Sequence, residues 1–188
     1  GWGLSVRPSL VSSLNKEGAD AATIFDLEPS LDASQRIGPN VLATITVNTD
    51  FAETEVDTRQ TNLTRFPLFF PEKRTFFLEG SDIFEFGFGT GSSTVLPFFS
   101  RTIGLVGNEQ VPIIAGAKIN GRIGGTAFGG LGVRTDTFDS EGIPYDATTM
   151  GVMRIRQNVF KESSVGFIGS VGDPLGRDGS FMSGLDFT

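Results

Sequence analysis

The chain has 188 residues and a formal net charge of −7, and it contains neither histidine nor cysteine. An acidic chain lacks the clustered Lys and Arg that neutralise phosphates, which argues against a nucleic-acid partner. Without cysteine and histidine, disulfides, thiolate metal sites and the usual nucleophilic triads are excluded, so we expect neither an enzyme nor a bound cofactor.

The length favours one domain, and the chain begins at Gly1 inside an alternating segment without a starting methionine. We therefore expect residues 1–188 to form a single β-barrel region of a longer protein. No run approaches the roughly 18 apolar residues of a transmembrane helix. This leaves a membrane-spanning β-barrel open, because each strand of a barrel carries a much weaker signal.

Three segments of alternating polarity begin the chain, at residues 3–13, 22–32 and 40–50. In the first of them, Leu4 and Val6 alternate with Ser5. A period of two residues predicts a β-strand with one apolar and one polar face.

Residues 51–111 interrupt this pattern and form an insert that holds most of the 18 phenylalanines of the chain. Prolines within it exclude a continuous helix or a central strand. Apolar side chains at this density must be buried against something, and the flanking strands suggest the inside of a barrel. We expect the run FFPEKRTFFLEG to act as a structural lock between the insert and the barrel wall, through buried rings and ion pairing. Its residues are Phe69, Phe70, Glu72, Lys73, Arg74, Phe76 and Phe77.

Five more alternating segments follow the insert, at residues 112–122, 125–135, 148–158, 163–172 and 180–188. With the first three they predict a meander of adjacent antiparallel hairpins. We expect the apolar positions on both sides of the insert to share one surface: Val41, Ala43, Ile45, Val47, Ile113, Ala115, Ala117 and Ile119. Basic residues recur opposite the apolar positions, and we expect them to form a lumen wall of Lys118, Arg134, Arg154 and Arg156.

Two architectures fit this alternation. A soluble β-sandwich also alternates, but its strands usually have about 5–6 residues. Here nearly every segment reaches about 10–11 residues, the length that crosses a bilayer at the usual tilt. We therefore favour an all-β antiparallel meander that forms a transmembrane β-barrel with an inward-folded, Phe-rich loop. The Phe-rich part of the insert, about 50 residues, would not fit inside an eight-stranded barrel, so these strands should be a fragment of a larger one.

The run TVNTDFAETEVD, followed by NLTRFPLFFPEKRTFFLEGSDIF and FFSRTIG, resembles the signature of a bacterial family known as domain of unknown function number 5916. The resemblance covers roughly residues 40–125, with Thr49 and Thr75 at positions where we expect proline. Members of the family look like outer-membrane β-barrels, and many carry a family 9-type carbohydrate-binding module ahead of the barrel. The resemblance implies a bacterial outer-membrane location with lipid as a partner. It implies no activity, because the family has none established, and the sugar-binding module is absent from this chain.

Other candidate sites are weaker. Acidic residues at the start of the insert could bind a hard cation such as Ca²⁺ through oxygen ligands, or they could splay to one solvated side. They are Asp50, Glu53, Glu55 and Asp57. A glycosidase would need two carboxylates a few ångströms apart, and nothing in the spacing of Glu72 and Glu79 brings them together. The glycine-rich run GFGTG is not followed by a helix that could present its N-terminus to phosphate.

We therefore expect an outer-membrane protein of structural, pore or surface-scaffold type, linked to the handling of extracellular polymers. Its partners would be lipid and either an extracellular polysaccharide or a partner protein. The alternative is a soluble carbohydrate-binding β-sandwich associated with a glycoside hydrolase. Phe84, Phe86 and Phe88 alternate in the insert and leave both readings open, since they could pack under the loop or stack on sugar rings.

Overall fold

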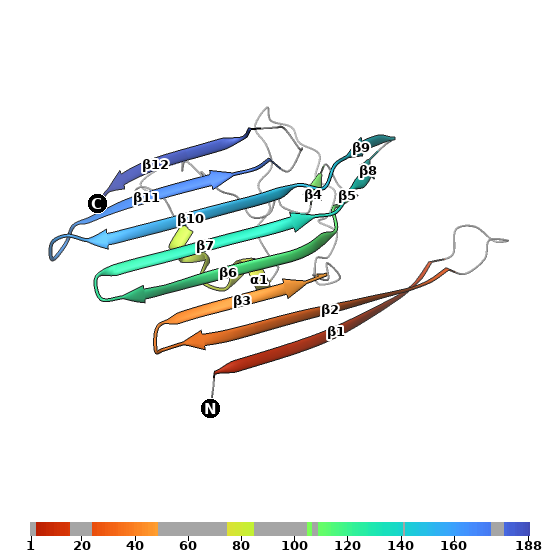
Figure 1. Ribbon diagram of the computed structural model, residues 1–188, viewed down its shortest axis with the longest axis horizontal. Coiled ribbons are helices and arrows are strands. Elements are labelled where there is room, and N and C mark those ends of the chain that lie inside the picture. Colours follow the sequence, from red (N-terminus) through yellow and green to blue (C-terminus); the bar gives the residue numbers. More distant parts are fainter. Residues whose placement is uncertain are drawn as a thin grey trace, which may run out of the picture.

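The computed structural model describes residues 3–15, 24–48, 75–84, 105–106, 109–140, 142–173 and 179–188. These residues form one eight-stranded antiparallel sheet, two small two-stranded sheets and two short helices (Figure 1). The strands of the large sheet are β1 (Leu4–Asn15), β2 (Ile24–Ile37), β3 (Val41–Val47), β6 (Ile113–Ile123), β7 (Thr126–Thr135), β10 (Thr149–Asn158), β11 (Ser164–Val171) and β12 (Phe181–Phe187).

The large sheet is a meander, because its strands lie side by side in the order in which they occur along the chain. All eight segments that alternate in the sequence form strands of this sheet, so the predicted all-β antiparallel meander is confirmed. The sheet is open within the described residues, with β1 and β12 as its two edges. A closed barrel is therefore not formed by these residues alone.

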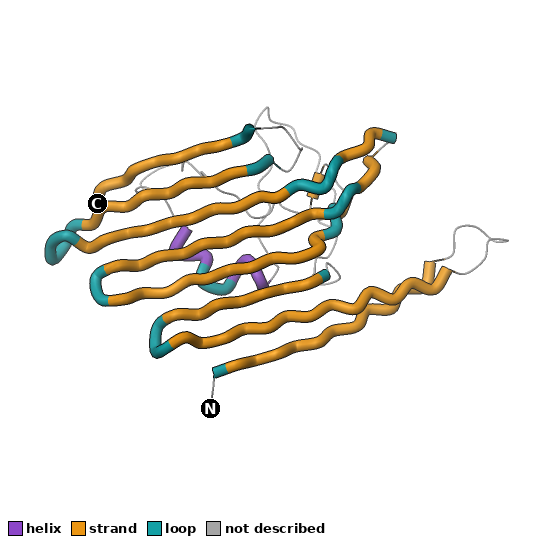
Figure 2. Tube along the Cα trace, in the orientation of Figure 1, coloured by secondary structure: helices purple, strands orange, loops and turns teal. Residues whose placement is uncertain are grey.

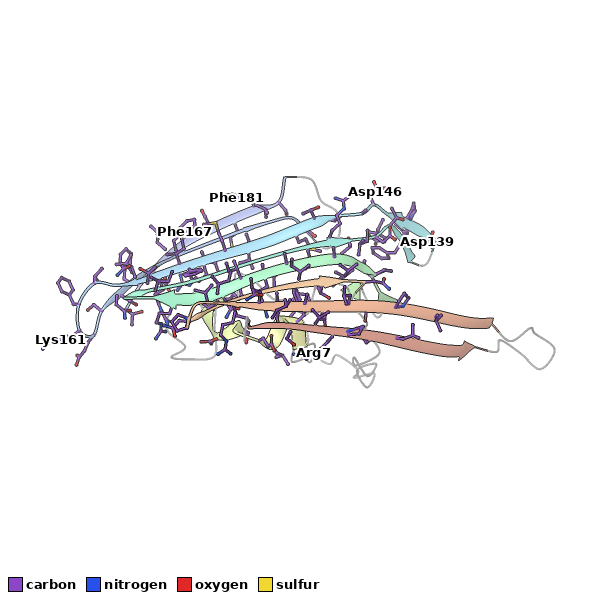
Figure 3. All side chains as sticks on the ribbon, turned by 60° about the horizontal axis from the view of Figure 1, so that its bottom comes forward. Arg7, Asp139, Asp146, Lys161, Phe167 and Phe181 are labelled. Atoms are coloured by element: carbon purple, nitrogen blue, oxygen red, sulfur yellow. The ribbon has the colours of Figure 1, made fainter. Side chains whose placement is uncertain are left out.

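Two short helices lie on one face of the sheet, α1 (Thr75–Leu78) and η1 (Ser81–Phe84) (Figure 2). We call this face the inner face and the opposite one the outer face. In Figure 3, Arg7 lies on the side of the helices, whereas Phe167 and Phe181 lie on the other side. No helix among the described residues is long and apolar enough to cross a membrane.

The alternation of the sequence separates the two faces, as β3 shows. Thr44 and Thr46 point inward and are buried, whereas Ile45 and Val47 point outward and are 57% and 45% exposed. Large apolar side chains are exposed on the outer face of seven of the eight strands. They are Leu4, Val6, Leu10, Leu27, Leu31, Ile37, Ile45, Val47, Ile119, Ile123, Met153, Ile155, Phe167, Val171, Phe181, Leu185 and Phe187.

The expectation that Ile113 shares this surface is wrong. The register of β6 against β7 shifts between Ile113, which pairs with Thr135, and Ala115, which pairs with Arg134. One extra residue in a strand reverses the direction of the side chains before it. Ile113 is therefore buried on the inner side, while Ala115, Ala117 and Ile119 face outward with the apolar residues of β3.

The connections at the two ends of the sheet differ in length. At one end the chain turns through residues 38–40, 124–125 and 159–163. At the other end it passes through residues 16–23, 48–112, 136–148 and 172–180 (Figure 1). The third of these longer connections contains a hairpin of β8 (Phe138–Ser140) and β9 (Ile143–Tyr145), and β4 (Leu105–Val106) pairs with β5 (Glu109–Gln110) within the second. The insert thus leaves and re-enters the sheet at the end with the long connections.

Candidate functional site

Helix α1 docks on the inner face through two phenylalanines. Phe76 and Phe77 are 7% and 3% exposed, and their rings meet edge to face with centroids 5.1 Å apart. They join a hydrophobic core on the inner face of the sheet, and half-buried Phe84 of η1 packs against the same core. The sheet contributes Ile113, Leu131, Val133, Met150, Val152 and Ile168 to this core. The two helices together are called the plug below.

A buried lysine of β6 fixes the end of α1. Lys118 is 3% exposed, and its Nζ donates hydrogen bonds to the backbone carbonyls of Phe76 and Glu79, the latter at 2.6 Å. The carbonyls at the C-terminus of a helix have no partner within the helix, and a cation there also complements the helix dipole. The ammonium also lies 5.2 Å from the centroid of the Phe76 ring, within the range of a cation–π contact.

Glycines on the inner face leave room for the plug. A Cβ at Gly129 of β7 would lie 2.4 Å from Cγ2 of Ile83, and one at Gly116 of β6 would lie 3.1 Å from the Phe76 ring. Glycine within a strand often marks such a close approach of another segment. The outward neighbour Gly130 has far more space, since its Cβ would meet only Cγ2 of Ile119 at 3.7 Å. The sheet is therefore shaped to receive the plug on the inner face.

A buried ion pair crosses the inner face beyond the plug. Arg154 of β10 is 1% exposed and donates from Nη1 and Nη2 to the two carboxylate oxygens of Asp186 in β12, at 2.7 and 2.5 Å. The pair spans β11 above Gly166, where a Cβ would lie 2.1 Å from Asp186 Oδ1. This two-pronged geometry is the strongest form of a guanidinium–carboxylate contact.

The inner face of β1–β3 is mostly polar, with Leu42 as an apolar exception, in contrast to the core under the plug. A pocket of about 30 Å³ opens between these strands and α1. It is lined by Ser5, Arg7, Asp32, Ser34, Thr44, Phe76 and Glu79. Thr44 is 6% exposed, and its Oγ1 has no hydrogen-bond partner among the described residues.

The sequence of this chain matches a known family over residues 4–118, more than half of its length. The family is described as a domain of unknown function (DUF5916). The chain belongs to this family. The matched part of the DUF5916 chain contains β1, β2, β3 and the plug, and it ends at Lys118. No curated protein and no solved structure matches the chain.

The DUF5916 chain brings three of the four predicted lumen-wall residues to one face. Lys118, Arg154 and Arg156 lie on the inner face, whereas Arg134 lies on the outer face. Arg134 is exposed at the end of its strand and donates to Thr149 Oγ1 at 2.8 Å. The reason is that the inward side chains of β7 are apolar, since they pack under the plug, and Arg134 alternates with them.

Of the predicted lock, the described residues contain Phe76 and Phe77, and both are buried. The other lock residues lie outside the described residues: Phe69, Phe70, Glu72, Lys73 and Arg74. The same is true of the whole candidate cation site: Asp50, Glu53, Glu55 and Asp57. Within the described ranges, no group of three or more acidic side chains is placed to hold a metal ion.

Several residues of the site were missed by sequence reasoning. Asp186 is the partner of Arg154, but the two are 32 residues apart and meet only through the register of three strands. Gly116 carried a usable signal, because it interrupts a strand on the face expected for Lys118, whereas Gly129 shares the face of Val133, which was expected to point outward. The sequence contains no signal that singles out Thr44 and Ser34, because hydroxyl side chains are common on the polar face of any strand.

Proposed function

We propose that this chain is part of an outer-membrane β-barrel whose lumen holds the plug, and that it serves as a pore or surface scaffold and not as an enzyme. The proposal rests on the distribution of side chains over the two faces of the sheet, which is inverted relative to that of a soluble protein. Apolar side chains such as Ile45 and Phe181 are exposed on the outer face, whereas Lys118 and Arg154 are buried on the inner face. A bilayer is the solvent that suits such an outer face, because a membrane barrel is apolar outside and polar within.

The size of the outer face supports a lipid partner. Strands about 4.8 Å apart make an eight-stranded face roughly 34 Å wide, and a strand of seven residues is roughly 23 Å long. The shortest strands here have that length, β3 and β12. The whole outer face therefore covers about 800 Å², and seven of its eight strands expose large apolar side chains on it, whereas the largest apolar patch on a typical soluble monomer is roughly 300–600 Å². Single exposed apolar residues need no explanation, but a continuous face of this size does.

The two ends of the sheet suggest an orientation in the membrane. Outer-membrane barrels have short turns on the periplasmic side and longer loops outside the cell. The three short turns at residues 38–40, 124–125 and 159–163 would then be periplasmic. The insert would enter the lumen from the extracellular end, where a plug can meet polymers or proteins outside the cell.

A matched pair of substitutions on one strand tests the proposal. Met153 lies in the middle of β10 and Gln157 near its short-turn end, both on the outer face and both exposed. In a bilayer, Met153→Arg should cost about 2–4 kcal/mol, whereas Gln157→Arg should cost about 0–1 kcal/mol, because the penalty falls toward the interface. The measurement is reversible unfolding of the protein from lipid vesicles.

In a soluble protein both positions would be ordinary exposed sites, and both substitutions would change stability by less than about 0.5 kcal/mol. Equal, small effects together with a monodisperse protein in detergent-free buffer would reject the membrane barrel. The soluble sandwich predicts a third result, because its second sheet would cover Met153: a large cost of Met153→Arg in a protein that stays monodisperse without detergent.

A further inference from the structure

The plug divides the inner face into two unlike halves. It packs on the apolar side chains of β7, β10 and β11, and Lys118 of β6 marks its boundary. Beyond this boundary the inward side chains of β1–β3 are mostly polar, with Leu42 as an exception. Those that line the pocket are Ser5, Arg7, Asp32, Ser34 and Thr44.

The pocket offers hydroxyl groups among charges of both signs. Ser5, Ser34 and Thr44 form one row, since they are direct neighbours across β1, β2 and β3, and Lys118 continues the row in β6. Arg7 faces Asp32 in the same way across β1 and β2. Glu79 also lines the pocket and the ammonium of Lys118 lies beside it, so two cations and two anions balance and the pocket favours neither anions nor cations.

One polar atom in this pocket needs a partner. Thr44 Oγ1 is buried without a hydrogen bond among the described residues, and an unsatisfied buried polar group costs about 1–3 kcal/mol. A volume of about 30 Å³ holds water-sized molecules. Water or a small hydroxylic solute would satisfy Thr44 and the neighbouring serines together.

We propose that a hydrated route for small, uncharged hydrophilic solutes runs along the inner face of β1–β3, beside the plug and not beneath it. This inference rests on the proposed barrel, since a route has meaning only if the inner face lines a lumen. The hydroxyl row would replace part of the water around a passing solute, and the plug would set the width of the route.

The first test blocks the route and uses a neighbouring position as control. Ser34 points into the pocket and Ala33, the next residue, points outward with Val6 and Ile45. Proteoliposomes containing the full-length protein are placed in glycerol, and swelling is followed by light scattering. Ser34→Phe should slow glycerol entry severalfold, whereas Ala33→Phe should leave it unchanged. Equal rates for Ser34→Phe and the parent protein would overturn the proposal.

The second test does not depend on transport. The chain contains no cysteine, so single thiols can be introduced. In vesicles, Ser34→Cys should react with a small, uncharged, hydrophilic methanethiosulfonate reagent on the order of tenfold faster than Leu131→Cys, because reaction needs an accessible thiolate. Leu131 is 6% exposed and lies under the plug. Equally slow reaction at both positions would show that the β1–β3 side is dry.

These outcomes separate the two proposals. If the barrel itself is wrong, the parent protein will not float with lipid vesicles and neither substitution can be compared in them. If the barrel is right and the route is wrong, the parent floats with lipid, but Ser34→Cys stays as unreactive as Leu131→Cys.

Discussion

The two faces of the eight-stranded sheet differ in the side chains that they bury. The inner face buries charged side chains and the outer face exposes apolar ones, which is the reverse of the usual arrangement in a soluble protein. On the inner face Arg154 is 1% exposed, whereas on the outer face Ile45 is 57% exposed. Full burial of an Ile side chain is worth about 1.5–3 kcal/mol in water, and burial of an unpaired charge costs several kcal/mol. Contact of the apolar outer face with water therefore does not stabilise the sheet. Every charge buried on the inner face needs a partner of opposite charge or a hydrogen-bond acceptor.

The inner face meets this demand by giving each buried cation defined acceptors. Arg154 has the carboxylate of Asp186, and Lys118 has two carbonyls at the end of α1. The outer face has no such network among its mid-strand side chains in the described residues. The stability of the inner face therefore depends on specific pairs of residues, whereas that of the outer face depends on the medium around it, and substitutions can disturb each face separately.

The largest effect is expected when a buried charge loses its partner. Asp186→Ala leaves the guanidinium of Arg154 buried without its carboxylate, which should lower the free energy of unfolding by about 3–5 kcal/mol. Chemical unfolding in detergent micelles or vesicles measures the change.

The double variant Arg154→Met with Asp186→Ala is the control for this prediction. Replacing a buried ion pair by apolar groups of similar size is often nearly neutral, so the double variant should recover most of the lost stability. A double variant as unstable as Asp186→Ala alone would mean that the pair does not act as a unit.

A smaller loss of stability is expected when a side chain fills the space on β7 against which the plug packs. Gly129→Val would force side-chain atoms into Ile83 and Phe84 of η1, and such overpacking costs about 1–3 kcal/mol. Gly130→Val, the next residue on the outer face, meets no such obstacle. Limited proteolysis should therefore find new cuts in residues 51–111 for Gly129→Val only. Identical digestion patterns for the two variants would contradict the docking of the plug on β7.

The sequence was sufficient to predict the strands because alternation is a local property. Each of the eight predicted segments forms a strand of the sheet, and the chain order gives the meander. The inner and outer faces were predicted correctly on β3, where Ile45 and Thr46 differ clearly in polarity. The hydrophobic pattern succeeds here because one face is apolar along its whole length.

The errors arose where a face is not uniform in polarity. Ile113 was assigned to the wrong face because a bulge is a local change of register that composition does not reveal. Arg134 was placed in the lumen because its apolar neighbour Val133 was assumed to face outward. Val133 is in fact buried on the inner side, 2% exposed, because it packs under the plug. Contacts that depend on a distant segment, such as Arg154 with Asp186, cannot be predicted from one strand alone.

The most direct test of the inverted sheet is the accessibility of spin labels along β3 in lipid vesicles. Single cysteines at Ile45 and Thr46 would carry the label, and relaxation by oxygen, which concentrates in lipid, would be compared with relaxation by a water-soluble nickel complex. We expect strong oxygen relaxation and little nickel relaxation at Ile45, and low values of both at Thr46, which is 0% exposed. Equal accessibility at the two positions, or strong nickel relaxation at Ile45, would contradict a lipid-facing outer face.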